Sequence, residues 1–367
     1  MEEPRKKSTT PRTRTSGTRR KNKKKKDSWL SRHSLGVMIA VIAVFVAIGA
    51  VLAFAFIPYG GSDKESDWVY IPSDATPSAV KDSLKTNLGS SMGTRVYMLW
   101  KLMGGSVAAS QGAYEVRGGQ TALNISRRIA LGRQTPVNVT FNGTRTMEQL
   151  SRRIAAQLQC TPEEFLEACA EILPESGFSR QGFPAAFIPD SYEFYWSASP
   201  RNVVRRLLDY RNRFWDDERR AKAKALGLTP VEVATIASIV EEETAKKDER
   251  PLVARLYLNR IHKGIKLQAD PTVKFATGDF TLRRITGKHL SIDSPYNTYR
   301  VKGLPPGPIR VPSAATLDDV LNAPKHDYIY MCAKEDFSGY HNFAKDYASH
   351  MANARRYQAE LNRRNIH

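Results

Sequence analysis

The chain has 367 residues, and its 56 Lys and Arg against 37 Asp and Glu give a formal net charge of +19. An apolar content of 41% with 25% charged residues is typical of a globular protein and excludes a disordered or collagen-like chain. Three cysteines are too few for a scaffold built from disulfides. Residues 1–34 hold 13 basic against 3 acidic side chains, so the rest of the chain does not require a nucleic acid as its partner.

Residues 35–57 form a run of 23 residues without a charge. As a helix this run would be roughly 35 Å long, which suffices to cross a bilayer core. A cleaved signal peptide is the alternative, because Ala53-Phe54-Ala55 is similar to a small-residue cleavage site. The apolar region of a signal peptide normally has about 7–15 residues, however, so we expect an uncleaved, single-pass transmembrane helix.

The basic tail, residues 1–34, lies directly before this run. Because Lys and Arg are enriched on the cytoplasmic side of a membrane helix, we expect a cytoplasmic N-terminus and a catalytic part outside the cytoplasm, at the cytoplasmic (inner) membrane. The tail could also bind anionic lipid or RNA, but a purely topological role is the simpler interpretation.

The three cysteines leave their pairing open. Cys160 and Cys169 flank or share one short helix that begins at a capping box at Thr161, so they are too far apart for a disulfide. Cys332 could pair with either of them in an oxidising compartment. Three small, buried, unpaired side chains are the simpler expectation.

The exported part divides into three ranges. Residues 58–82 are polar and predict a linker that leads into a first strand near Trp68–Ile71, residues 83–160 predict a small α/β subdomain, and residues 161–367 predict the catalytic domain. Within the subdomain we expect strands at 113–116 and 137–141, a turn at Asn142-Gly143, and helices at 122–131 and after Thr146.

Three features of the sequence predict the start of one helix. Thr229 can cap the helix, Pro230 fits its first turn, and Glu232 completes a capping box. Apolar residues then recur at the helical spacing i, i+3, i+4, i+7, which predicts a buried stripe; they are Val233, Ile236, Ala237 and Val240.

Three consecutive carboxylates follow at Glu241, Glu242 and Glu243. At 100° per residue they point in different directions. Glu242 is expected to face water, Glu241 to lie over small alanines, and Glu243 to lie above the apolar stripe. Burial against apolar atoms raises the pKa of a carboxyl group, so Glu243 is the candidate general acid. An ordinary acidic helix surface is the alternative.

Stiff loops and a second helix come next. A helix through Val253–Ile261 ends at Gly264, and the polar segments 267–272 and 294–299 are followed by the Pro-rich loop 303–308. Aromatic rings and amides on stiff loops beside one acid suit a sugar, because rings stack on pyranose faces and amides bind hydroxyl groups. A final basic helix is expected at about 347–362, packed on the domain.

These segments resemble a known family, the MltG (YceG-like) endolytic transglycosylases of bacterial cell walls. The resemblance is strong over about 187–350 and looser over 68–160, where that family has a LysM-like subdomain. The residues that carry it are Ala237–Thr244, Glu249-Arg250, Asn259-Arg260, Leu267–Val273, Tyr296–Tyr299 and Gly303–Gly307.

The resemblance implies an α+β fold with an N-terminal transmembrane helix, a LysM-like α/β subdomain and a mixed α/β catalytic domain. It implies an enzyme that cleaves MurNAc–GlcNAc β-1,4 bonds within nascent glycan strands and leaves 1,6-anhydro-MurNAc ends, and so terminates strand elongation. Its partners would be glycan strands and, through the family, penicillin-binding proteins, with no cofactor and no metal.

The implied catalytic residue is Glu243, the second acid of the family's E-x-E-T motif. Thr244, Tyr296 and Asn297 resemble substrate-side residues of lytic transglycosylases in general. We add three residues of the neighbouring polar and aromatic segments as substrate-binding candidates, namely Gln268, Asp270 and Tyr299. His341 and His350 are expected to be structural or to lie on the substrate side, and a structural role is the simpler expectation.

The hypothesis for the reaction is that Glu243 first protonates the glycosidic oxygen and then, as a carboxylate, removes the proton from the C6 hydroxyl of the sugar. Two alternatives stay open. One is a two-carboxylate hydrolase, with Asp270 or Asp190 as second acid, which would leave a reducing end. The other is a membrane-anchored adaptor that binds glycan and cleaves nothing. The motifs of zinc peptidases, P-loops and serine hydrolases are absent from the sequence.

Overall fold

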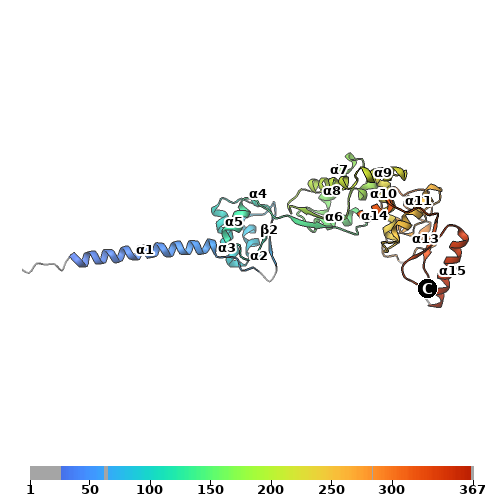
Figure 1. The fold of residues 1–367 in the computed structure, drawn as a ribbon. Coiled ribbons are helices and arrows are strands. Elements are labelled where there is room, and N and C mark those ends of the chain that lie inside the picture. Colours follow the sequence, from blue (N-terminus) through green and yellow to red (C-terminus); the bar gives the residue numbers. More distant parts are fainter. Residues whose placement is uncertain (1–25, 62–64, 283, 365–367) are drawn as a thin grey trace, which may run out of the picture.

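The structure is a computed structural model that describes residues 26–61, 65–282 and 284–364, with side chains described from residue 34 onward. Most of the predicted basic tail therefore lies outside the described residues. Figure 1 shows a long N-terminal helix, α1 (Lys26–Phe56), that leads into a small unit, which is followed by a larger one. The chain mixes helices with three two-stranded antiparallel sheets in its described part, in agreement with the expected α+β class.

The small unit is built on one strand pair. Strand β1 (Asp67–Ile71) pairs with β2 (Gly112–Val116), so that Asp67 faces Val116 and Ile71 faces Gly112. Four helices belong to this unit: α2 (Pro77–Leu88), α3 (Ser90–Leu102), α4 (Val107–Ser110) and α5 (Ala122–Ala130). Their shared core consists of buried apolar side chains, among them Val69, Ile71, Leu84, Val96, Trp100, Tyr114, Ile125 and Ile129. The predicted strands and the helix at 122–131 are confirmed here; the LysM-like character of the unit stays a prediction.

The structure describes residues 58–61 and 65–82 of the stretch expected to be a linker, and the strand expected near Trp68–Ile71 is confirmed. The stretch contains β1 and the start of α2. Just after α1, the N–H of Tyr59 donates to the carbonyl of Gln120 (2.7 Å), and the carbonyl of Tyr59 accepts from the N–H of Gly119 (2.8 Å). Tyr59 and Ala55 are buried. Strand pairing and these buried side chains therefore attach the end of α1 and the start of this stretch to the small unit.

The boundary between the units also differs from the expected one at residue 160. Strand β3 (Val137–Thr140) pairs with β4 (Ser191–Phe194) of the larger unit. Val139 and the side chains of the following helix, α6 (Met147–Ala155), belong to the larger core. The turn at Asn142-Gly143 therefore does not close a local hairpin, because β3 finds its partner some fifty residues later.

Helices form most of the larger unit. The elements before its central helix are α7 (Pro162–Glu175), the 3-10 helix η1 (Arg180–Ala186), α8 (Pro200–Phe214) and α9 (Asp217–Ala225). The capping box at Thr161 is present, and all three cysteines are free thiols. Cys160 and Cys169 are buried as expected, while Cys332 is only partly buried.

Helix α10 (Pro230–Glu243) is the core of this unit. Its predicted start is confirmed, because Thr229 and Glu232 form a capping box with Pro230 in the first turn. Every side chain from Val233 to Val240 is buried. Because α10 contacts α9, α11, α12, α14 and η1, it is covered all round rather than on one stripe.

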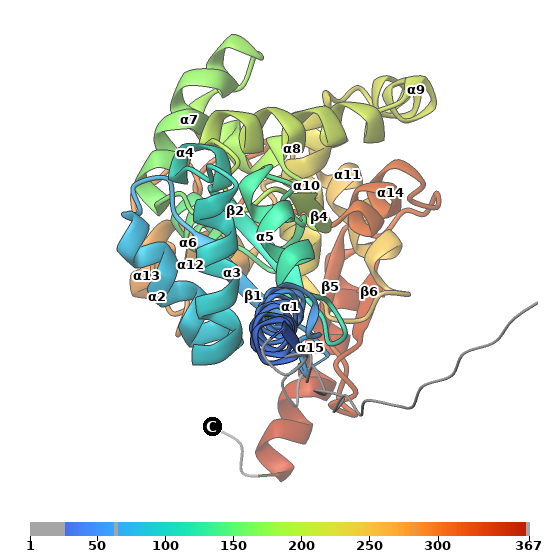
Figure 2. The same ribbon diagram turned by 90° about the vertical axis from the view of Figure 1, so that its left-hand side faces the viewer.

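The remaining elements complete the unit around the end of α10. They are α11 (Arg250–His262), α12 (Asp270–Thr277), α13 (Gly287–Leu290), α14 (Ala314–Leu321), β5 (Tyr330–Ala333), β6 (His341–Ala344) and α15 (Tyr347–Arg363). Strands β5 and β6 form an antiparallel hairpin. The last helix packs against that hairpin, which confirms the expected packing of the C-terminal helix. Figure 2, a view along α1, shows the small unit in front of the larger one.

The crossing of α2 and α3 yields a stability prediction. A Cβ atom at Gly93 would lie 2.5 Å from the carbonyl oxygen of Leu84, and backbone atoms cannot move aside as a flexible side chain can. Gly93→Ala is therefore expected to lower the free energy of unfolding by about 1–3 kcal/mol. Thermal unfolding of the full chain in detergent, followed by circular dichroism, measures this. Ser91→Ala, an exposed change in the same helix, is the control, and equal stability of the two variants would contradict the close packing.

Candidate active site

Glu243 is the last residue of α10, and the chain turns out of the helix at Thr244 (φ −137°). Its side chain lines two cavities, of about 420 Å³ and about 910 Å³. The residues that line these two cavities lie between positions 242 and 361 of the sequence. The smaller is lined by Glu243, Leu256, Tyr257, Arg260, Leu267, Gln268, Asp270, Tyr299, Tyr330, Met331, Cys332, Ala333, His341, Tyr347 and His350. The larger is lined by Glu242, Glu243, Asp270, Pro271, Lys274, Leu282, Arg284, Ile285, Tyr357, Gln358 and Leu361.

The carboxyl group of Glu243 is the most perturbed acid of this region. Burial raises its pKa to about 7, and the negative charge of Asp270 acts in the same direction. The hydroxyl of Tyr257 donates a hydrogen bond to Oε1 (2.5 Å), which opposes the rise, as does the nearby His341. Burial is the larger effect, so a substantial share of Glu243 is protonated at neutral pH, as a general acid requires.

Glu242 does not face water as the helical wheel predicted. It accepts from Arg145 (3.0 Å) and from Arg310 (2.8 Å), and its side chain is only 12% exposed. Arg145 immediately precedes the cap residue of α6, and Arg310 follows the Pro-rich loop. The prediction from the helical wheel was wrong because both segments cover this side of α10. A helical wheel describes one helix alone and contains no information about such contacts.

Glu241 is held just as firmly on another side of the helix. It accepts from the N–H of Ser313 (3.0 Å) and from the hydroxyl of Thr316 (2.7 Å), and Nε of Arg310 lies 3.1 Å from its second oxygen. Two of the three consecutive carboxylates are therefore neutralised by arginine. Glu243 alone of the three reaches the cavities with a neutral hydrogen-bond donor as its partner.

Asp270 is the second carboxylate of the site. It begins α12 and lines both cavities with Glu243. The hydroxyl of Tyr299 donates to its Oδ1 (2.6 Å). The neighbouring Gln268 has a left-handed backbone (φ 50°), and its side-chain oxygen accepts from Arg260 (2.5 Å). Such strained backbone in a non-glycine residue is typical of a functional site.

A family model now decides the classification, because the model of the YceG-like family matches residues 69–356. The chain belongs to the YceG-like family. The endolytic murein transglycosylase of Bacillus subtilis (strain 168) is 25% identical over 299 residues, which are 76% of this chain and 82% of that protein. The endolytic murein transglycosylase of Streptococcus pneumoniae serotype 2 is 37% identical over 114 residues, which are 30% of this chain and 21% of that protein.

A crystal structure of a YceG-like protein from Listeria monocytogenes has the same fold. It superposes with a TM-score of 0.53 at 23% sequence identity and covers 78% of this chain and 98% of that one. At this identity the likeness concerns the fold alone. The motif segments that predicted the family from sequence all lie inside the matched range of the family model.

The structure brings together some of the predicted site residues of this family member and not others. Glu243, Gln268, Asp270 and Tyr299 line one cavity. Thr244 is buried, and its hydroxyl donates to Glu249 (3.0 Å). The side-chain amide of Asn297 is also buried, and donates to the carbonyls of Leu290 and Ile292. Both side chains therefore hold the backbone around the site.

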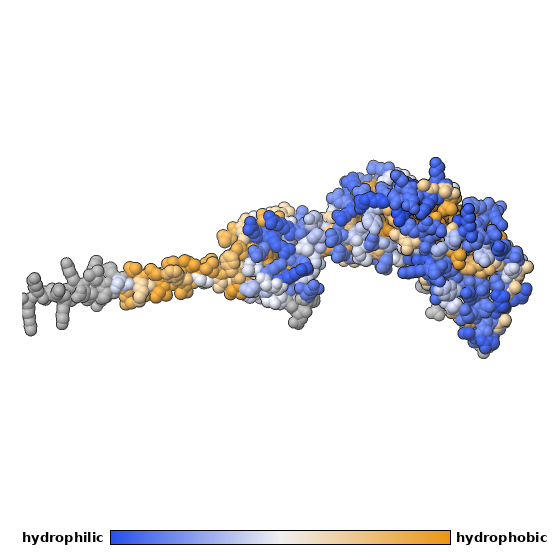
Figure 3. Space-filling model, viewed as in Figure 1, coloured by the Kyte–Doolittle hydropathy of each residue, from blue (hydrophilic) through white to orange (hydrophobic). Residues whose placement is uncertain are grey.

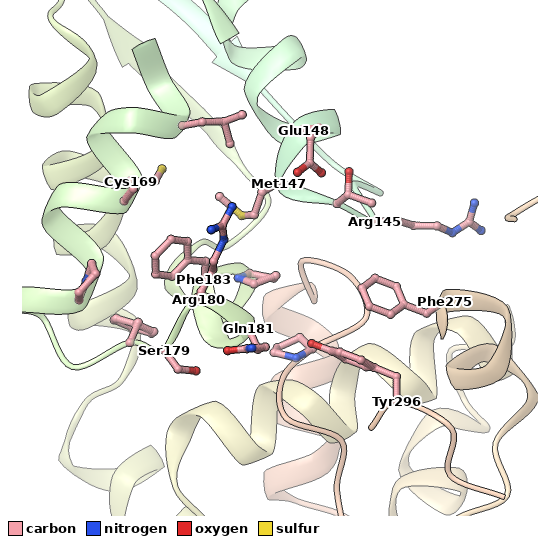
Figure 4. Close-up of a pocket in the computed structure, with 17 residues that line it drawn as sticks. Arg145, Met147, Glu148, Cys169, Ser179, Arg180, Gln181, Phe183, Phe275 and Tyr296 are labelled. Carbon is pink, nitrogen blue, oxygen red and sulfur yellow. The ribbon is translucent and has the colours of Figure 1, made fainter. Parts of the chain in front are cut away.

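Tyr296 lies in a different cavity, of about 680 Å³, which does not include Glu243. Figure 4 shows its ring beside Phe275, with the two ring centres 4.7 Å apart, and Arg180 and Gln181 projecting into the same space. Asp190 lines neither cavity of Glu243; it accepts from Tyr210 and from the N–H of Ser191. Of the two carboxylates weighed as partners of Glu243, only Asp270 is beside it.

Two features of the site were missed from the sequence. Tyr257 falls inside the predicted helix through Val253–Ile261 without a predicted role at the site, although a buried tyrosine hydroxyl needs a partner and so offered a signal. His341, expected to be structural, lines the cavity, and its Nδ1 lies 2.8 Å from the buried Glu249. The backbone N–H of His341 also donates to Glu249 (2.7 Å). No sequence signal links these two residues, because 92 positions separate them.

The hydrogen bond from Tyr257 allows a direct test of the electrostatics. Tyr257→Phe is expected to raise the pKa of Glu243 above about 7, because the lost hydrogen bond stabilises the carboxylate. The carboxyl band of Glu243, identified by infrared difference between the wild type and Glu243→Gln, would be followed against pH. Tyr195→Phe, at an exposed tyrosine of the same unit, is the control. A pKa that stays unchanged or falls in Tyr257→Phe would contradict this account.

Proposed function

We propose that this chain is a membrane-anchored endolytic transglycosylase that cleaves MurNAc–GlcNAc β-1,4 bonds in peptidoglycan and leaves 1,6-anhydro-MurNAc ends. The names of the relatives from Bacillus subtilis and Streptococcus pneumoniae support the substrate class. The observation that carries the proposal is a single acid, Glu243, with a pKa of about 7 on the wall of a polar, tyrosine-lined cavity.

In the proposed reaction, protonated Glu243 gives its proton to the glycosidic oxygen while an oxocarbenium-like transition state forms. The Glu243 carboxylate then accepts the proton of the C6 hydroxyl, and this oxygen bonds to the anomeric carbon. The proton count of the enzyme is restored, and no water is consumed. A carboxyl group with a pKa near the working pH suits both steps, because it is neither a strong acid nor a strong base.

Surrounding residues have supporting roles in this proposal. Tyr257 orients the carboxyl group of Glu243 through its 2.5 Å hydrogen bond. Tyr299 and Tyr330 supply rings that can stack on pyranose faces and exclude water from the anomeric carbon. Gln268 and Asp270 offer hydrogen-bond acceptors to sugar hydroxyl groups. Thr244 and Asn297 act indirectly, by fixing the backbone on either side of the site.

A two-carboxylate hydrolase is the second candidate, because Asp270 lines both cavities together with Glu243. In that reaction one carboxyl group protonates the leaving oxygen and the other activates water or attacks the sugar. The product would then carry a reducing end. A glycan-binding adaptor that cleaves nothing is the remaining alternative.

The proposed location rests on α1. Its residues Ser34–Phe56 are long and apolar enough to cross a membrane, with a mean hydropathy of 3.0, although a signal sequence would pass the same test. We propose a single-pass anchor with a cytoplasmic N-terminus and the rest of the chain outside. Peptidoglycan synthases such as penicillin-binding proteins would then be neighbours in the same membrane, and a cut in a nascent strand would end its elongation.

Product analysis decides between these functions. The full chain in detergent, incubated with uncrosslinked glycan strands, is expected to give internal fragments with 1,6-anhydro-MurNAc ends in mass spectrometry. Glu243→Gln should lower the rate by at least about 10²-fold, since it removes the general acid. Glu148→Gln, an exposed carboxyl-to-amide change without a partner to lose, is the control. Reducing ends that vanish in Asp270→Asn would establish the hydrolase instead, and binding without any cleavage would establish the adaptor.

The pH dependence follows from the raised pKa of Glu243. The protonated form starts the reaction, so kcat/KM is expected to fall as pH rises through about 7, approaching tenfold per pH unit. Tyr257→Phe should move this fall to higher pH. The free energy of unfolding is expected to fall with rising pH as well, because the folded state holds the proton of Glu243 more tightly than the unfolded state does. The contribution of Glu243 to stability is therefore present below pH about 4.5 and is lost as pH rises through about 7. A rate that rises through this range would contradict the assignment.

A further inference from the structure

The small unit carries an apolar surface beside the end of α1. We call it the apolar face, and it consists of four exposed side chains: Met98 (54% exposed), Leu102 (84%), Met103 (40%) and Leu131 (54%). The first three lie on or directly after α3, and Leu131 follows α5, which packs against α3. Figure 3 shows hydrophobic surface that continues from α1 over the adjoining end of this unit.

A basic cavity lies along α5, one helix of this pair. Its volume is about 350 Å³, and its lining residues are Gln120, Asn124, Arg127, Arg128 and Arg133. Arg128 is fixed by hydrogen bonds to the carbonyl of Glu115 (3.0 Å) and to Thr135 (2.9 Å). Arg127 and Arg133 are exposed, and their side chains make no hydrogen bond or ion pair within the described residues. Guanidinium groups that converge on one cavity match the oxygens of a phosphate.

The unit cannot turn freely about the end of α1. The backbone bonds of Tyr59 to Gln120 and Gly119 tie the chain after α1 to the turn before α5, and α1 itself contacts α3 and α5. If α1 crosses a bilayer, these contacts keep the same end of the unit towards the bilayer surface. Apolar side chains with arginines beside them are the pattern of a surface that lies in a membrane interface.

We propose that the apolar face of the small unit inserts into the interfacial layer of the bilayer that α1 spans, with the phosphate of an anionic phospholipid in the arginine-lined cavity. This inference rests on the proposed membrane anchor, and it is independent of the proposed reaction. The docked unit sets the height and direction of the larger unit above the membrane, because the side-chain amides of Gln134 and Gln159 join the two units by hydrogen bonds to Ser197 (3.0 Å) and Ser73 (2.7 Å).

Depth-resolved fluorescence quenching tests the insertion. The full chain is reconstituted in nanodiscs of phosphatidylcholine and phosphatidylglycerol (3:1), with an environment-sensitive fluorophore introduced as an unnatural amino acid at position 102. Lipids with a nitroxide near the headgroup are expected to quench this label several-fold more strongly than the same label at position 201, on α8 of the larger unit. A label at Ile48, within α1, reports on the span itself and is read with lipids that carry the nitroxide on the acyl chain, because roughly 12 Å of helix separates it from Phe56 at the end of the span.

Each outcome is informative. Quenching at 48 and 102 but not at 201 supports the docked unit. Quenching at 48 alone overturns the docking and leaves the anchor intact, whereas absence of quenching at 48 overturns both. Cleavage of glycan strands by the same sample shows separately whether the proposed reaction holds.

The arginine cavity is tested by charge removal. Arg127→Gln with Arg133→Gln should weaken the quenching at 102 in nanodiscs that contain phosphatidylglycerol, and pure phosphatidylcholine should weaken it in the wild type. The matched control removes two exposed arginines of the larger unit, Arg152→Gln with Arg205→Gln, and should leave the quenching unchanged. Equal quenching in all four samples would overturn the phosphate site and leave only an apolar contact.

Discussion

The structure depends on how the end of α10 is buried. Three carboxylates in a row end a helix whose preceding eight side chains are all buried, so their charges must be compensated within the protein. Arg310 reaches both Glu241 and Glu242, and Arg145 supplies a second partner for Glu242. Within the described residues, Glu243 receives only a tyrosine hydroxyl as a hydrogen-bond donor. Burial therefore raises its pKa to about 7, and the hydrogen bond from Tyr257 opposes this rise only in part.

The same arrangement explains why the larger unit is assembled from distant segments. Arg145 precedes α6, Arg310 follows the Pro-rich loop, and Tyr257 comes from α11. Asp270 of α12 and residues of the β5–β6 hairpin line the smaller cavity together with Glu243. The positions of these segments depend on their contacts with the three carboxylates at the end of α10. The catalytic proposal therefore concerns a tertiary arrangement and not a single helix.

Local structure was largely predictable from the sequence. The capping boxes at Thr161 and Thr229 predicted two helix starts, strands were predicted at 113–116 and 137–141, and alternating side chains indicated the second of these strands. These signals act between residues a few positions apart. The boundary at 160 was misplaced, because a strand partner far along the chain decides it: β3 pairs with β4. The amphipathic wheel likewise placed Glu242 in water because it ignores the segments that cover α10.

For this protein, the sequence by itself determined the apolar N-terminal run, the helix that ends in Glu243 and the motifs of the YceG-like family. Helix capping, hydrophobic periodicity and the order of motifs are properties of neighbouring residues, so they can be recognised in the sequence without a structure. The tertiary structure decided which of the three carboxylates has no arginine partner within the described residues, and which predicted site residues line the cavity beside Glu243. Those outcomes depend on charges and hydroxyl groups that meet only after folding, as Glu249 and His341 do across 92 positions.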